Sequence, residues 1–139
     1  MKTTLLILCF FFIFGCAHKV SEEDLRNLNG YWEIQRVTFA DGKVKEYKVN
    51  PSLDYIQIDG LNGFRKKVYP KFDGTYDTTN DAEFFEIISY ESNFEFNYKN
   101  ELSQWKETII SLSTNKFSVI DKENITYEYK RFEPINVQK

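Results

Sequence analysis

Residues 93–99, NFEFNYK, alternate between aromatic and polar side chains. Successive side chains of an extended chain point to opposite faces, so Phe94, Phe96 and Tyr98 share one side. The glutamate and the asparagine between them take the other side. This pattern predicts a β-strand that buries one face in a core and turns the other face to solvent.

The same pattern recurs along most of the chain. From residue 31 onward, runs of aromatic and β-branched residues are separated by Gly, Asn, Asp and Pro, which is typical of strands joined by turns. Most connections are short and favour antiparallel hairpins between sequence neighbours, whereas residues 71–82 form one long predicted connection. The predicted strands are 31–39, 43–49, 54–59, 63–70, 83–91, 93–99, 104–113, 116–121 and 125–133.

A row of about eight or nine such strands has two exposed edges unless the sheet closes on itself. A closed meander of about eight strands has room for packed side chains or for one small ligand. The predicted fold class is therefore all-β, an antiparallel up-and-down eight- to nine-stranded barrel that forms one domain over residues 21–139. An open β-sandwich is the alternative, because the connection at residues 71–82 could hide a change of sheet.

The segment before the first strand predicts one short helix. Residues 21–30, SEEDLRNLNG, place Ser21 three residues before Asp24, which is the spacing of a capping box. Acidic residues fill the first turn, two leucines lie about one turn apart, and the Asn-Gly pair is a typical helix end.

The N-terminus carries the features of an export signal. Lys2 precedes an apolar run at residues 5–14 that is too short to span a bilayer and has the length of a secretory signal. The following stretch, IFGCAHKV, resembles the lipobox of bacterial lipoproteins, in which the cysteine is acylated and the chain is cut before it. The resemblance implies a signal peptide over residues 1–15, a lipid on Cys16 and a lipidated tether over residues 16–20.

This interpretation predicts an outer-membrane protein, lipid-anchored on the periplasmic face or at the cell surface. A membrane-spanning anchor and an ordinary signal with a chance cysteine are the alternatives. Cys9 lies in the predicted leader, so an acylated Cys16 would leave no thiol for a disulfide. The folded domain must then be held together by its core.

Two stretches resemble the lipocalin family and its bacterial lipocalin-like lipoproteins. Residues 28–34, LNGYWEI, follow a short helix and are similar to the Gly-x-Trp opening of lipocalins, and residues 127–132, YEYKRF, are similar to the ending of the lipoproteins. The resemblance implies that Trp32 lies inside the closed end of the barrel with Arg131 over its ring. A cation–π contact of this kind contributes about 0.5–2 kcal/mol. Gly30 would allow the tight turn into the first strand, where a side chain would be obstructed.

The composition argues against several functional classes. A formal net charge of −3 gives no basic surface for nucleic acid. The one histidine, His18, falls in the predicted tether, so no Ser-His or Cys-His pair and no histidine metal site is expected. Residues 73–81 are rich in oxygen ligands but lack the order of a calcium loop. We therefore expect no enzyme activity, no metal and no cofactor.

Paired carboxylates are the remaining route to acid–base chemistry, because burial can raise the pKa of one member of such a pair. The candidates lie on different predicted strands, and the simplest interpretation places them on solvated strand faces. These candidates are Asp54, Glu83, Glu86 and Glu107.

The expected function is non-enzymatic binding or carriage of a small hydrophobic or amphiphilic molecule. Lys66 shares a predicted face with Phe64 and would meet the carboxylate of such a ligand if that face were the interior, although a solvent-reaching or paired lysine is the simpler alternative. A barrel filled with side chains is the competing hypothesis, with residues 71–82 contacting a protein or envelope component. The candidate ligand-binding residues are Phe64, Lys66, Phe94, Phe96, Tyr98 and Tyr127.

Overall fold

The computed structural model describes residues 19–134, so the predicted leader, Cys16 and His18 lie outside the described residues. The described chain is almost entirely β-structure with one short 3-10 helix. Its elements are η1 (Glu23–Leu28), β1 (Gly30–Thr38), β2 (Val44–Glu46), β3 (Leu53–Asp59), β4 (Asn62–Pro70), β5 (Tyr76–Tyr90), β6 (Asn93–Lys99), β7 (Gln104–Leu112), β8 (Lys116–Asp121) and β9 (Thr126–Arg131).

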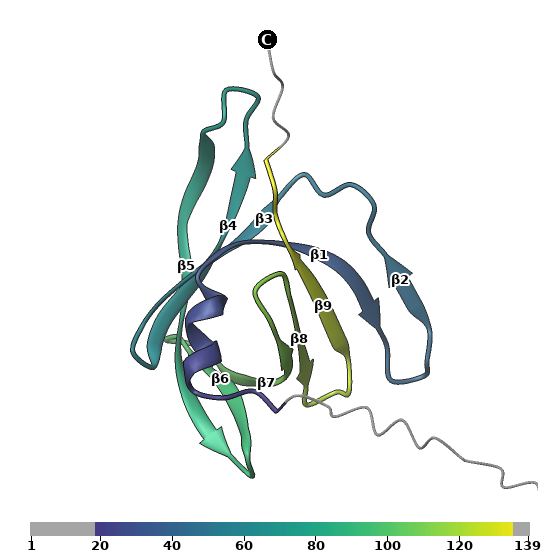
Figure 1. Cartoon of the computed structure of the whole chain (residues 1–139), viewed down its shortest axis with the longest axis vertical. Helices are drawn as coiled ribbons and strands as arrows, with labels where there is room; N and C mark the ends of the chain where they lie inside the picture. The colour runs from purple at the N-terminus through teal and green to yellow at the C-terminus, as the bar shows by residue number, and fades with distance from the viewer. Residues whose placement is uncertain (1–18, 135–139) are drawn as a thin grey trace, which may run out of the picture.

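The strands form one closed antiparallel sheet (Figure 1). From β3 to β9 each strand pairs with the next, and β1 closes the ring by pairing with β3 at its start and with β9 along its length. The short strand β2 pairs with the end of β1, beyond the point where β3 leaves it. The structure confirms the predicted up-and-down barrel and excludes the sandwich, because no strand changes sheet.

The sequence prediction was wrong about part of the long connection. β5 begins at Tyr76, so residues 76–82 extend a hairpin with β4 that projects past the ring of strands in Figure 1. The pairing shifts at a bulge, since Lys66 pairs with Ala82 but Val68 pairs with Thr78. Most side chains of this extension are exposed on both faces, and the apolar alternation that marks a half-buried strand is therefore missing from its sequence.

Helix η1 lies across the end of the barrel where β1 begins, which we call the closed end. The predicted capping interaction is present, because the Ser21 backbone N–H donates to Asp24 Oδ2 at 2.8 Å. Leu25 and Leu28 are buried beneath the helix, and Val20, which the sequence assigned to the tether, is also buried in the core. Among residues 19–134, no helix is long and apolar enough to cross a membrane.

Side chains fill the barrel above the closed end. Fully burying a large apolar side chain contributes about 1.5–3 kcal/mol, and aromatic rings supply much of this core. Phe96 is fully buried and meets Phe85 edge to face, while Trp32 meets Phe117 in the same way. The largest fully buried side chains are Trp32, Tyr98, Phe96, Phe117, Leu28, Leu53, Ile56, Ile87, Ile109 and Val119.

Candidate functional site

The closed end holds a tryptophan beneath an arginine. Trp32 has no exposed surface, and its indole Nε1–H donates to the carbonyl of Leu28 at 2.8 Å. The guanidinium carbon of Arg131 lies 3.9 Å from the centre of the Trp32 ring. The Arg131 nitrogens donate to three backbone carbonyls, those of Asn27, Asn29 and Thr114, and so tie η1 to β9 and to the β7–β8 turn.

Gly30 joins η1 to β1 at this end. Its φ of +122° lies in a region that side-chain-bearing residues rarely adopt, and a Cβ there would meet Nη1 of Arg131. The glycine therefore allows the guanidinium to approach the backbone. Both features are consequences of closing the barrel, and neither Trp32 nor Arg131 lines a hollow that opens toward the other end.

The middle of the barrel contains a network of charged and hydroxyl groups around Arg65. Its guanidinium Nη2 lies 3.1 Å from Asp54 Oδ2 and donates to the Tyr129 hydroxyl, and its Nη1 lies 3.4 Å from Glu107 Oε2. The Asp54 carboxylate takes a second cation, because Lys67 Nζ lies 2.6 Å from Oδ1. We call this set the polar cluster, and its members are Asp54, Arg65, Lys67, Tyr98, Glu107 and Tyr129.

The cluster is electrostatically balanced, with two cations against two carboxylates. Burial raises the pKa of Asp54, but the charges of Arg65 and Lys67 outweigh it and hold the pKa below its usual value. At Glu107 burial is the larger effect, and the pKa is raised although Arg65 opposes the rise. Burial also raises the pKa of Tyr129 to about 12, so its hydroxyl stays neutral.

Two hollows open beside the cluster, at the end of the barrel opposite η1. The larger, which we call the mouth hollow, has a volume of about 530 Å³ between β1, β9 and the chain that leads into β3. Its lining is mixed, because apolar and aromatic side chains lie beside the polar residues Asn50 and Ser52 and the charged residues Asp54 and Lys67. The apolar and aromatic side chains are Ile34, Val37, Tyr47, Val49, Tyr127 and Tyr129.

The second hollow lies on the other side of the Asp54–Lys67 ion pair and has a volume of about 440 Å³. It is more polar, because the acidic residues Asp81 and Glu83 on β5 line it. Asp54 and Lys67 contribute to both hollows, so this ion pair lies where the two meet.

The six predicted ligand-binding residues do not form one site. Tyr127 lines the mouth hollow, whereas Phe94, Phe96 and Tyr98 belong to or pack against the core. Their placement in the core supports the filled-barrel hypothesis for the part of the barrel between the closed end and the polar cluster.

The prediction that Phe64 and Lys66 could face the interior was wrong. Arg65 between them is buried in the polar cluster, so alternation turns Phe64 and Lys66 to the outer surface of β4. There the Lys66 ammonium lies 5.9 Å from the centre of the Phe64 ring. Arg65 is the residue of this stretch that faces the interior, because its carboxylate partners there, Asp54 and Glu107, come from other strands.

The polar cluster is the part of the site that the sequence analysis missed. Asp54 and Glu107 were interpreted as residues of solvated faces, but Asp54 is 3% exposed and both surround Arg65. The adjacent basic residues Arg65, Lys66 and Lys67 were the one available signal. A run of three cations on a strand must place at least one on the inner face, where it needs a partner.

The outer surface carries a row of touching aromatic rings over β1, β3, β4 and β5. Tyr76 stacks on Tyr31 at 4.4 Å between ring centres, and Tyr31 lies 4.8 Å from Tyr55. The row continues to Phe64 and Phe84, and the Phe84 side chain is 65% exposed. We call these five residues the outer aromatic row.

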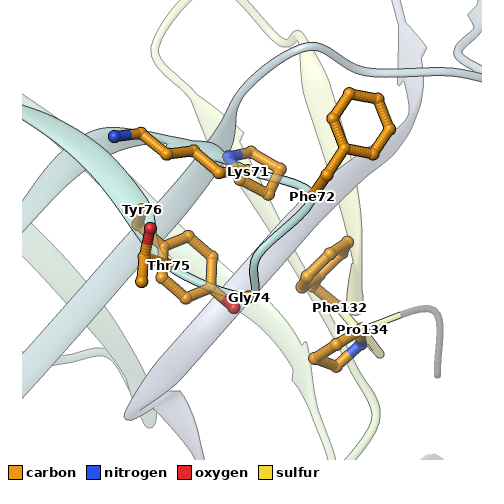
Figure 2. A pocket seen from close by; sticks show the side chains of 8 residues that line it. Lys71, Phe72, Gly74, Thr75, Tyr76, Phe132 and Pro134 are labelled. Carbon is orange, nitrogen blue, oxygen red and sulfur yellow. The ribbon is translucent and has the colours of Figure 1, made fainter. Parts of the chain in front are cut away.

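A groove of about 330 Å³ lies beside this row, where the β4–β5 turn meets the chain after β9. In Figure 2 the rings of Phe72 and Phe132 lie on one side of the turn at Gly74 and the ring of Tyr76 lies on the other. Asp73, in the oxygen-rich stretch of residues 73–81, accepts hydrogen bonds from Thr75 in this turn. Over the described residues, no three His, Cys, Asp or Glu side chains are grouped so as to hold a metal ion.

No protein-family model and no curated protein sequence matches the chain. Among solved structures, a lipocalin-like protein from Bacteroides uniformis ATCC 8492 is 14% identical with a TM-score of 0.49, covering 76% of this chain and 99% of its own. An uncharacterized protein from Bacteroides eggerthii DSM 20697 is 11% identical with a TM-score of 0.48 and the same coverages. Apocrustacyanin C1 is 12% identical with a TM-score of 0.44, covering 88% of this chain and 76% of its own.

Proposed function

We propose that this protein is a non-enzymatic binding protein that holds a small hydrophobic or amphiphilic molecule in the mouth hollow. The observation that carries the proposal is the hollow itself. Its volume of about 530 Å³ falls within the range of roughly 300–1,000 Å³ that small-molecule sites occupy. Such sites combine apolar and aromatic side chains with polar groups that orient the ligand, and the mouth hollow offers Val37, Tyr47 and Tyr127 beside the charged Asp54 and Lys67.

The polar cluster sets the depth that a ligand can reach. Arg65 is 7% exposed, and its donors are engaged by acceptors from β3, β6, β7 and β9. Removing one partner of a buried charge pair costs about 3–5 kcal/mol, so a ligand has little to gain by displacing Arg65. The bound molecule therefore stays in the mouth hollow, against Tyr127 and Tyr129, and does not reach Arg65.

The arrangement of the chain suits a protein that is tethered at its N-terminus. Val20 is packed at the closed end, and the mouth hollow is lined by Val37 and Tyr127, which lie toward the opposite ends of β1 and β9. An acyl chain on Cys16 would hold the closed end nearest the membrane and direct the mouth away from it. We propose such an anchor at the outer membrane on the grounds of the sequence alone.

Two exposed valines allow a direct test of the binding site. Val49 lines the mouth hollow and is 88% exposed, whereas Val44 on β2 is 53% exposed and does not line it. The apolar dye N-phenyl-1-naphthylamine should bind the purified protein with a fluorescence increase. Val49→Trp should weaken the binding of the dye by about tenfold, equivalent to about 1.4 kcal/mol, and Val44→Trp should leave the binding unchanged. Equal binding to both variants would contradict the proposed site.

A second candidate function is supported by the outer surface. The exposed Phe72 and Phe84 lie at the groove and at the far end of the outer aromatic row, and contiguous exposed apolar surface marks interaction sites. The alternative is an interaction module that contacts a protein or another envelope component through this surface. Cross-linking in cells should then yield a defined product that Phe72→Ser and Phe84→Ser abolish and Val49→Trp does not.

A further inference from the structure

We propose that the mouth hollow selects amphiphiles with an anionic head group, and that Lys67 is the residue that recognises the negative charge. The inference rests on the proposed function and names the class of ligand for the same site. The charged groups around the hollow differ in their availability to a ligand. Some already have partners, and one still has free hydrogen-bond donors.

The carboxylate of Asp54 is poorly available to a cationic ligand, because a cation already pairs with each of its oxygens. Its Oδ2 lies 3.1 Å from Arg65 and its Oδ1 lies 2.6 Å from Lys67, and the residue is 3% exposed. A ligand cation would have to displace one of these partners and would meet the positive charge of the other. The mouth hollow therefore disfavours amines and other cationic head groups.

The guanidinium of Arg65 is poorly available to an anionic ligand as well. Its two terminal nitrogens are engaged by Asp54, Glu107 and the hydroxyls of Tyr98 and Tyr129. These acceptors are packed around it from four strands, and its side chain is 9% exposed. Arg65 thus fixes the position of Asp54, and it does not itself reach a ligand.

Lys67 differs from both of these residues. Its ammonium carries three N–H donors, of which Asp54 Oδ1 engages one, and its side chain is 56% exposed at the junction of the two hollows. Among the residues that line the mouth hollow it is the one cation. An anionic head group that enters there finds free charge-assisted donors in Lys67 and no unpaired carboxylate.

The two hollows differ in the charge that they present, which favours one orientation of the ligand. Asp81 and Glu83 line the second hollow and would repel an anion there. The mouth hollow holds its apolar and aromatic side chains on the other side of Lys67, which suits the ligand's hydrophobic part. The head group therefore binds at Lys67 from the mouth-hollow side, with the tail against Tyr47 and Tyr127.

A matched pair of dyes tests the charge preference. N-phenyl-1-naphthylamine is neutral, and 8-anilinonaphthalene-1-sulfonate has a similar aromatic body with a sulfonate. We expect the protein to bind the sulfonate about tenfold more tightly, equivalent to about 1.4 kcal/mol. In Lys67→Gln the ratio of the two dissociation constants should fall to about one, and Lys67→Arg should restore it. The control is Lys66→Gln, a neighbouring lysine outside the mouth hollow, which should keep the preference.

Each outcome of this experiment decides between the two proposals. If the protein binds both dyes equally, or if Lys67→Gln keeps the preference, the inference about Lys67 is wrong while the binding site stands. If neither dye binds, or if Val49→Trp has no effect on either, the proposed function fails and the inference fails with it. Circular dichroism of each variant establishes that it is folded, and Lys67→Arg gives a charge-keeping variant if Lys67→Gln unfolds.

Discussion

Two arginines lie over aromatic rings inside this barrel, and the barrel holds them in different ways. Arg131 lies over Trp32 at the closed end, and its donors reach backbone carbonyls. Arg65 lies 4.9 Å from the centre of the Tyr129 ring, and its partners are carboxylates and hydroxyls. The acceptors of Arg131 carry no net charge, whereas those of Arg65 include two titratable acids.

The difference separates a structural end of the barrel from a site-forming one. Neutral carbonyl acceptors make the closed end independent of protonation, which suits a region that only has to join η1 to the strands. A buried ion cluster contributes little net stability compared with apolar packing, but it fixes where each charge lies. At the mouth that fixed arrangement leaves Lys67 exposed with donors to spare, so the polar cluster shapes the proposed ligand site.

The largest expected effect comes from removing the charge at the centre of the polar cluster. Arg65→Met leaves Asp54 and Glu107 facing each other across a buried space, and we expect a loss of about 3–5 kcal/mol in the free energy of unfolding. Chemical denaturation at neutral pH measures this loss. Arg36→Met is the matched control, because Arg36 forms exposed ion pairs on the outside of β1 and its removal should leave the free energy of unfolding nearly unchanged.

Removing the other arginine should cost less. Arg131→Met gives up the contact with Trp32 and the bonds to three carbonyls, and we expect a loss of about 2 kcal/mol, because no charge is left unpaired and the carbonyls can take water. Denaturation compared directly with Arg65→Met tests the ranking. A loss at Arg131 as large as that at Arg65 would mean that the two sites do not differ as described.

The close approach of Arg131 to the backbone at Gly30 should have a smaller effect on stability. A comparison of alanine substitutions at two glycines isolates this effect. Gly30→Ala introduces strain at a positive φ and also a clash with Arg131, whereas Gly42→Ala introduces a positive-φ residue in open space. We expect a loss of about 1–3 kcal/mol for Gly30→Ala and about 1 kcal/mol for Gly42→Ala, measured by thermal denaturation. Equal losses would show that the guanidinium moves aside without cost.

The smallest effect is a dependence of stability on pH to which the two acids of the polar cluster should contribute with opposite signs. The pKa of Asp54 is lowered from 3.8, so its contribution is present above that pH and is lost as the pH falls through the folded-state value. The pKa of Glu107 is raised from 4.5, so its contribution has the opposite sign and is lost as the pH rises above that value.

These opposite signs can be separated by two isosteric variants. Asp54→Asn should reduce the loss of stability at acid pH, and Glu107→Gln should reduce the loss that accompanies the rise above pH 4.5. Urea denaturation at several pH values between about 3 and 7 follows both, since stability changes wherever the folded and unfolded states bind different numbers of protons. An unchanged pH profile in both variants would contradict the assigned electrostatics.

The sequence predicted the barrel because its information about the fold is local. Alternation in residues 93–99 identifies a half-buried strand without knowledge of the neighbouring strands, and Phe96 and Tyr98 do face the core. The first half of β5 was missed for the same reason. Residues 76–82 have no mainly buried face, so their extended conformation leaves no periodic signal.

The candidate site was harder to predict because it depends on contacts between distant strands. Nothing near Arg65 in the sequence shows that Asp54 and Glu107 will surround it, and an isolated charge is normally expected to face solvent. Once Asp54 is known to face Arg65, the position of Lys67 can be inferred, because the pairing register places Lys67 opposite Asp54. The sequence therefore predicted the barrel, and its candidate cation, Lys66, is the neighbour in sequence of the Lys67 that we propose for the binding site.

The measurement that tests the central claim most directly is native mass spectrometry of the protein purified without detergent, followed by solvent extraction of whatever it carries. The account predicts a stoichiometric added mass belonging to an anionic amphiphile, and its loss in Val49→Trp. A bare protein mass that does not change after incubation with fatty acids and other apolar anions would contradict a ligand site in the mouth hollow.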